Sequence, residues 1–247
     1  MLRLNVYLDG APEGPWMGHT LDEIGCIWLA PTQGEAISAA PGAIAAFYRW
    51  LRQHGEPGVG PVAAKDLKAE IREVQEVPGF GKSGSAVGFF KPDSRPVTDE
   101  DLAAAVRRLG YARRDLLGLV AGLPPEALDW EPPGGKRTVR GNLIHVAQCH
   151  AFYLSRLLGY ERVAELMPRP WPEDTFACLE WVMERAVGVL LELPKELRSG
   201  TFRTEQPAES WTARKMLRRF VEHELEHVEV VRRTVTAWRR RSSGGAG

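Results

Sequence analysis

The chain has 247 residues, of which 44% are hydrophobic and 26% are charged, so it suits one large or two ordinary domains with buried cores. Its 32 basic and 32 acidic residues cancel, whereas nucleic-acid-binding domains usually carry a basic excess. No apolar run reaches the ~18 residues that a membrane span requires.

The first half of the chain has the pattern of an α+β fold. Alternating apolar and polar residues predict a half-buried strand over residues 2–8. Three more strands are predicted, at residues 16–20, 26–30 and 70–77. A helix is predicted from Thr32 or Gln33 to His54, and Pro41 leaves open whether it begins only there.

The second half changes to the 3.6-residue periodicity of amphipathic helices. Residues 78–97, rich in Gly, Pro and Ser, are predicted to connect the two halves. Thr98 and Asp101 have the spacing of a capping box, and Thr138 is placed to cap the next helix. The predicted helices cover residues 98–123, 138–158, 176–190 and 210–238, and Arg239 to Gly247 is predicted to be a frayed tail.

This pattern predicts an α+β fold class with two domains. An α+β domain with its linker is expected at residues 1–96, and an all-α four-helix bundle at residues 97–241. Four-helix bundles build metal sites from side chains on facing helices. Candidate metal ligands are therefore expected on the helices of the second domain.

Two histidines one helical turn apart, His223 and His227, lie at the rim of the apolar face of the last helix. Neutral imidazoles at this spacing can bind one metal ion, although histidines bonded to water or carboxylates would have the same spacing. The string from His223 to His227 also matches the HExxH signature of zinc proteases. No His, Asp or Glu follows Glu229 to supply the downstream ligand of those folds, which makes the protease interpretation the weaker one.

Glu224 lies between these histidines and within the apolar face. A buried carboxylate needs a partner or a raised pKa. Three roles are open for it: a catalytic general base, a group that holds a ligating imidazole, or the partner of an arginine from another helix.

The third ligand has to come from an earlier helix, where His145 and His150 are the candidates. His150 falls within the apolar arc of its helix, whereas His145 points away from that arc. The helical wheel alone therefore favours His150.

Three motifs of the second half occur together, in order, in a known family. They are Leu128–Pro133 (LDWEPP), Thr138–Val146 (TVRGNLIHV) and the HxxxH pair His223 and His227. With them, the stretch from about Thr98 to Val235 resembles the DinB/YfiT-like superfamily of four-helix metalloproteins. The resemblance implies His145, His223 and His227 as the three ligands, against the choice made by the wheel.

The same resemblance implies a divalent metal, and zinc, nickel, iron and manganese are all compatible with imidazole ligands. It also implies a metal-dependent hydrolase or a thiol-dependent S-transferase. Three protein ligands leave coordination positions open, as catalytic sites do. A non-catalytic metal or small-ligand binding module, or an interaction protein, is the alternative.

The first half resembles the small HicB-like α+β fold, on the pattern of a strand, then Trp16 to His19, then a strand and a helix. The expected partners are a small-molecule substrate, such as a low-molecular-weight thiol, and a second copy of the chain as a homodimer. Nucleic acid and membranes are not expected. A cytoplasmic location is expected, because the N-terminus lacks the regions of a signal peptide and the three cysteines show no disulfide framework.

Overall fold

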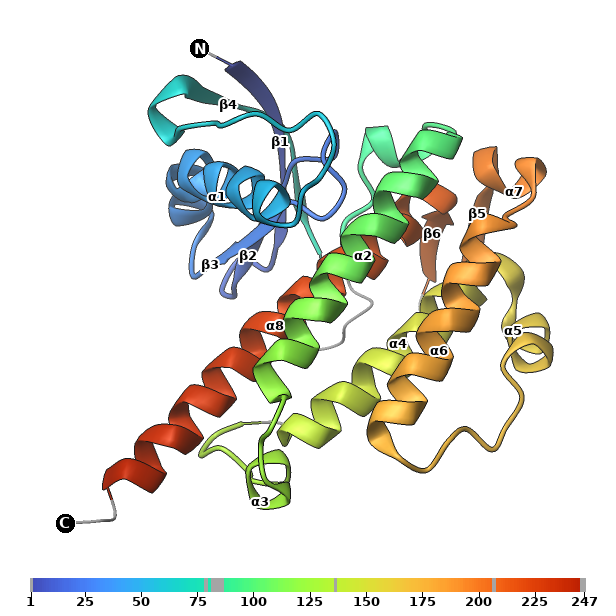
Figure 1. The fold of residues 1–247 in the computed structure, drawn as a ribbon. Helices are drawn as coiled ribbons and strands as arrows, with labels where there is room; N and C mark the ends of the chain where they lie inside the picture. The colour runs from blue at the N-terminus through green and yellow to red at the C-terminus, as the bar shows by residue number, and fades with distance from the viewer. Residues whose placement is uncertain (1, 78–79, 81–86, 136, 206–207, 245–247) are drawn as a thin grey trace. The chain divides into compact units, whose positions relative to one another are not determined.

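The computed structural model describes residues 2–77, 80, 87–135, 137–205 and 208–244. The chain forms two compact units, Met1–Val97 and Thr98–Gly247 (Figure 1). No helix within the described ranges combines the length and the apolar character that crossing a membrane requires.

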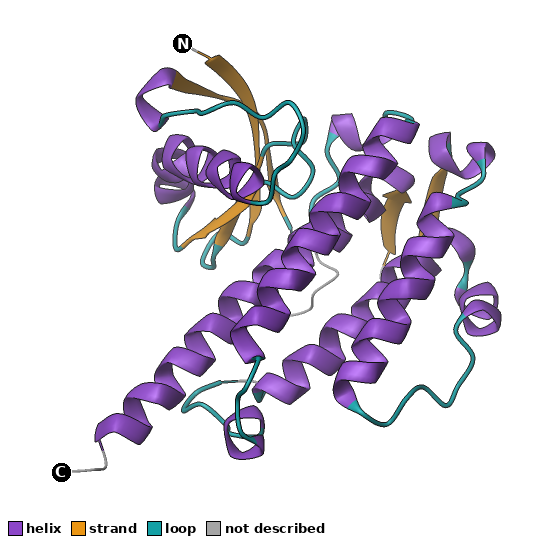
Figure 2. Cartoon of the chain, viewed as in Figure 1, coloured by secondary structure: helices purple, strands orange, loops and turns teal. Residues whose placement is uncertain are grey.

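The first unit is a four-stranded sheet packed against one long helix (Figure 2). The strand order is β3-β2-β1-β4, in which β1 and β4 are parallel and the other pairs antiparallel. The strands are β1 (Leu2–Gly10), β2 (Trp16–His19), β3 (Ile27–Ala30) and β4 (Leu67–Glu76). The helix is α1 (Gln33–Gln53), and short 3₁₀ turns are η1 (Ala64–Asp66) and η2 (Lys91–Ser94). The four strands and the helix predicted for the first half are confirmed, whereas its relation to the HicB-like fold stays a prediction.

Helix α1 begins at Gln33 and contains Pro41, so Pro41 does not mark its start. The side chain of Thr32 accepts a hydrogen bond from the backbone N–H of Glu35, which caps the helix. Ala36 is fully buried before the proline, as is Ile44 after it. Burial of this continuous face outweighs the hydrogen bond that Pro41 removes.

The second unit contains the predicted four-helix bundle. Its long helices are α2 (Asp99–Val120), α4 (Val139–Leu158), α6 (Thr175–Leu191) and α8 (Ala213–Gly244). Helix α2 packs against α8 and α6, and α4 packs against α6 and α8. In Figure 1, α2 and α8 run in one direction and α4 and α6 in the other. Helices α4 and α8 are therefore neighbours whose side chains can meet.

Side-chain caps determine where these helices begin. The hydroxyl of Thr98 accepts a hydrogen bond from the N–H of Asp101, and the Asp101 carboxylate accepts one from the N–H of Thr98. Arg214 of α8 binds the same carboxylate at 2.6 Å, which joins the start of α8 to the start of α2. Thr138 caps α4 through the N–H of Gly141. Both predicted caps are confirmed.

The second unit is not all-α, because a hairpin of β5 (Thr201–Glu205) and β6 (Ala208–Thr212) precedes α8. Helix α8 begins at Ala213 rather than near Ser210, since Trp211 of β6 is buried, with ring contacts to Phe152 and Tyr153 of α4. Short helices also occur in the connections: α3 (Pro125–Leu128), α5 (Tyr160–Leu166) and α7 (Lys195–Ser199). Helix α8 continues to Gly244, through the arginines that were predicted to fray. Arginine has high helix propensity and is favoured at a helix C-terminus.

A fragment that begins at Asp93 is expected to fold and to keep the metal-binding capacity predicted for the bundle. The four long helices and their caps all lie after this residue, so their mutual packing needs no side chain that the fragment lacks. Circular dichroism and metal content of the fragment would test this. Recovery of aggregated, metal-free protein would show that the first unit is required.

Of the predicted connection, residues 87–97 belong to the first unit, where Phe90 and Asp93 are fully buried and the N–H of Gly88 donates to Asp9. The expectation that the connection is the most protease-sensitive internal segment of the full chain therefore falls on its earlier part. Residues 78–79 and 81–86 of this predicted connection lie outside the described residues. Limited proteolysis with N-terminal sequencing of the products would locate the cut.

Candidate metal centre

The fold brings three histidines together, His145 from α4 and His223 and His227 from α8. One ring nitrogen from each lies within 4.8 Å of the others. The ring centre of His145 lies 5.2 Å from that of His223 and 5.0 Å from that of His227. The ring centres of His223 and His227 are 4.5 Å apart. Among the described residues, this is the group of ligating side chains that could hold a metal ion.

These ring separations fit a common metal ion. A metal about 2.1 Å from a coordinating imidazole nitrogen lies about 3.2 Å from the ring centre. Two such rings then have centres about 4.5 to 5.2 Å apart for angles at the metal of about 90° to 110°. The three measured separations span this interval. The ring centres therefore lie at separations compatible with shared coordination, and their candidate ligand atoms lie within 4.8 Å of one another.

The imidazoles are also in the form that binds metals. Burial lowers the pKa of His145 to about 4 and that of His227 to about 3, and it holds the pKa of His223 well below its usual value. All three rings are therefore neutral near pH 7, as metal ligation requires. The buried Nδ1 atoms of His223 and His227 have no hydrogen-bond partner among the described residues, and the same holds for Nδ1 of His150 outside the group. Such unsatisfied nitrogens are rare unless a water or an ion binds the ring.

The face of α4 that carries His145 continues with other polar side chains. Cys149, one turn later, has its sulfur 3.5 Å from Nε2 of His145, and burial raises the pKa of this thiol to about 12. Tyr153, a further turn on, is buried and has its ring centre 5.7 Å from that of His223. Cys149 is not part of the ligand group. These two residues form one wall beside the histidines.

On α8, the turn before His223 holds Arg219, which is 1% exposed. Its guanidinium donates to the carboxylates of Glu222 and Glu226, both at 2.9 Å, and to the hydroxyl of Tyr153 at 3.4 Å. Glu222 is 1% exposed, which is unusual for a carboxylate. The arginine compensates the carboxylate and makes its burial tolerable.

Glu224 is fully buried and is held by groups from two other helices. Its Oε1 accepts a hydrogen bond from Nε of Arg113 at 2.6 Å, and its Oε2 lies 3.2 Å from the arginine Nη2 and 3.1 Å from Nε2 of His150. Burial acts to raise the pKa of Glu224, but Arg113 and His150 outweigh it and lower the pKa to about 2. A carboxylate with so low a pKa is a weak base at neutral pH. Of the three roles considered, the geometry favours the partner of an arginine.

His150, which the helical wheel preferred as a ligand, is buried as the wheel implied but does not join the other histidines. Its ring lies against Phe220, and its Nε2 contacts Glu224. Arg113, which anchors this network, was not singled out from the sequence. The sequence did contain a signal for Arg113, because a charged residue stands between Ala112 and Leu116 on the buried face of α2.

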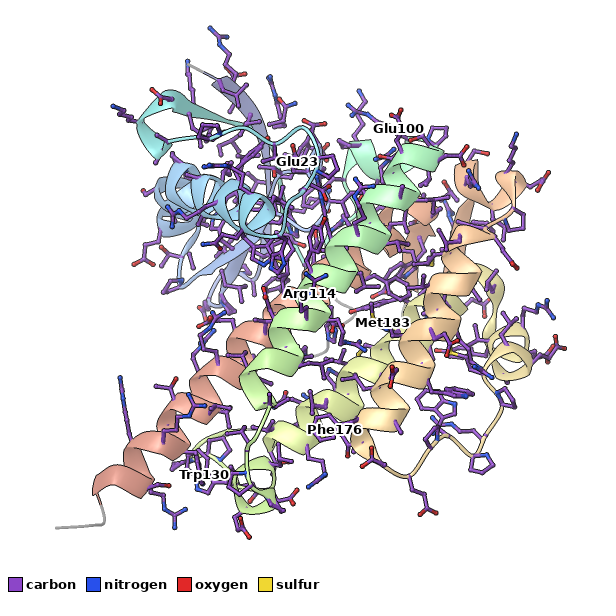
Figure 3. The ribbon with its side chains drawn as sticks, in the orientation of Figure 1. Glu23, Glu100, Arg114, Trp130, Phe176 and Met183 are labelled. Carbon is purple, nitrogen blue, oxygen red and sulfur yellow. The ribbon has the colours of Figure 1, made fainter. Side chains whose placement is uncertain are left out.

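The Arg113 network borders a different hollow from the histidines. Arg113 lines a cleft of about 410 Å³ between α2 and α6. Phe176 and Met183 of α6, both labelled in Figure 3, line the same cleft. None of the three clustered histidines lines this cleft. The cleft is therefore lined by a different set of residues from the histidine cluster, and Arg113 is the member of the Glu224 network that reaches it.

A protein-family model and a solved structure match the chain. The family model described as the DinB superfamily matches residues 108–231. Among solved structures, the chain is similar to YfiT from Bacillus subtilis, described as a probable metal-dependent hydrolase with an unusual four-helix bundle topology. The two chains are 21% identical, the match covers 64% of this chain and 95% of that chain, and the TM-score is 0.44. No curated protein matches the chain.

Proposed function

The chain belongs to the DinB superfamily, and from this premise we propose that His145, His223 and His227 bind a divalent metal with which the protein acts on a small-molecule substrate. The observation that carries the proposal is the clustering of three neutral imidazoles at the ring spacing of a shared metal. The donor set is all nitrogen, which suits zinc, nickel, iron or manganese.

When bound, such a metal supplies a Lewis acid with coordination positions left for a small ligand. His223 and His227 are buried and hold the inner side of the site, whereas His145 is only partly buried. Access for a substrate is therefore expected on the side of His145. Hydrolysis of an ester-like bond and transfer of a small thiol are the two reaction classes that this arrangement suits.

The chain's own residues argue against the zinc-protease interpretation. In that interpretation the glutamate of HExxH acts as the general base. Glu224 would have to leave Arg113 and His150, which engage both of its carboxylate oxygens. Breaking a buried pair of this kind costs about 3–5 kcal/mol.

Metal analysis of protein purified without added metal tests the proposal first. We expect close to one divalent ion per chain, together with turnover of ester or thiol-conjugation substrates that is lost with a chelator and restored by the metal. His227→Ala is the matched inactive variant. Metal binding without turnover across such panels would favour the non-catalytic binding module, and absence of bound metal would contradict the site itself. A homodimer stays a prediction, which sedimentation of the full chain would test.

A further inference from the structure

Arg137 is an exposed cation whose guanidinium makes no hydrogen bond or ion pair with any residue that the structure describes. It lies next to Thr138, the cap of α4. By contrast Arg140, three residues later, is paired with Asp129 at 2.7 Å. Arg137 is therefore available to a ligand from solution.

The stem of Arg137 lies next to the face of α4 that carries His145. Gly141 precedes His145 by one turn on that face. A Cβ atom added to Gly141 would lie 3.4 Å from Cβ of Arg137 and 3.9 Å from its Cγ. Such a Cβ atom would be in ordinary van der Waals contact with the arginine stem, so the stem lies beside Gly141, on the side of the helix that carries His145.

The charge of Arg137 also reaches the histidines. Besides burial, which is the larger cause, Arg137 lowers the pKa of His145, and it acts in the same direction on His227. On Cys149, burial raises the pKa, and the charges of Arg219 and Arg137 act against it.

The other charges around the centre are already compensated within the bundle. Arg219 is neutralised by Glu222 and Glu226, and Glu224 is neutralised by Arg113. Three neutral imidazoles leave the charge of a divalent ion uncompensated. With metal bound, the site would hold two positive groups without a partner, the ion and Arg137, and would attract an anion.

Building on the proposed function, we propose that Arg137 is a specificity-determining residue that binds an oxyanion of the substrate while the reacting group of the substrate meets the metal. The substrate class is therefore a small molecule that carries a carboxylate or a tetrahedral oxyanion a few bonds from its reacting group. Arginine presents a planar fork of donors that matches either kind of oxyanion with two hydrogen bonds.

Three matched thiols test this on the full chain loaded with cobalt: mercaptopropionate, mercaptoethanesulfonate and the uncharged mercaptoethanol. Thiolates bind metals directly, so their binding is measured by the change in the visible cobalt spectrum. We expect Arg137→Gln to weaken binding of at least one charged thiol by about tenfold or more and to leave mercaptoethanol within about twofold. Arg137→Lys is expected to retain most of the preference for the charged thiol.

Arg162→Gln is the matched control, because Arg162 is an exposed arginine of α5 that pairs with Glu165. It should leave the binding of all three thiols unchanged. A loss confined to mercaptopropionate identifies a carboxylate, and a loss confined to mercaptoethanesulfonate identifies a tetrahedral oxyanion. The inference would be overturned if Arg137→Gln weakened the binding of charged and uncharged thiols equally. It would also be overturned if the binding of all three thiols were unchanged, or if no thiol bound to the cobalt protein. In those cases the cobalt content still measures the proposed metal site separately, and failure of the wild-type protein to bind cobalt would overturn both.

Discussion

His223→Ala or His227→Ala is expected to lower the affinity for the metal by more than ~100-fold, because even groups that only orient a ligand contribute about 10–100-fold. Each histidine supplies one of three protein ligands, and two remaining imidazoles hold a divalent ion weakly. His145→Ala is expected to have the same effect, since its ring lies 5.0 to 5.2 Å from the other two ring centres. Metal content after gel filtration, with competition against a chromogenic chelator, measures the change.

The matched control for the ligand variants is His150→Ala, on the same helix as His145. His150 contacts Glu224 rather than the clustered histidines, so its loss is expected to lower stability and leave the metal in place. The melting temperature of each variant distinguishes a loss of ligand from a loss of fold. The assignment would be contradicted if His150→Ala released the metal while His145→Ala retained it.

Glu224→Gln is expected to lower the free energy of unfolding by about 3–5 kcal/mol, because it leaves Arg113 as a buried charge without its partner. The two residues are only 0% and 8% exposed at their side chains. Metal content should not change, since the carboxylate is directed to Arg113 and His150. Urea denaturation followed by the helical circular dichroism signal measures the loss.

Two further variants sharpen this result. Glu229→Gln removes an exposed carboxylate of the same helix, which pairs with Arg232 and Arg233, and should change stability by less than about 1 kcal/mol. Arg113→Met combined with Glu224→Gln should recover part of the loss, because no unpaired charge remains.

Other outcomes would assign Glu224 a different role. A fall of about 10–100-fold in metal affinity would show that the carboxylate supports a ligating imidazole. Unchanged metal content and unchanged stability, with turnover reduced about 100-fold or more, would restore the general-base role.

Much of the bundle follows from interactions within a few residues, which a sequence displays directly. The capping pattern of Thr98 and Asp101 and the cap at Thr138 identified where two helices begin, because a cap involves neighbours three residues apart. The placement of His223 and His227 on one face of a helix needed only the helical repeat. These local features indicated a four-helix bundle with a pair of candidate ligands on its last helix, whereas the choice of His145 as the third ligand came only from the family resemblance.

Tertiary structure decided what depends on the neighbouring element. A helical wheel assigns a direction around a single helix axis, and it placed His150 towards the core, where it is found. The packing of the four helices decides which helix faces each side chain. It brings the partly buried His145 next to His223 and His227 of α8, and it brings His150 next to Glu224. The hairpin before α8 likewise depends on burial of Trp211 against α4, a contact between residues far apart in the chain. Local spacing carries no information about such contacts, because their free energy arises only when distant segments meet.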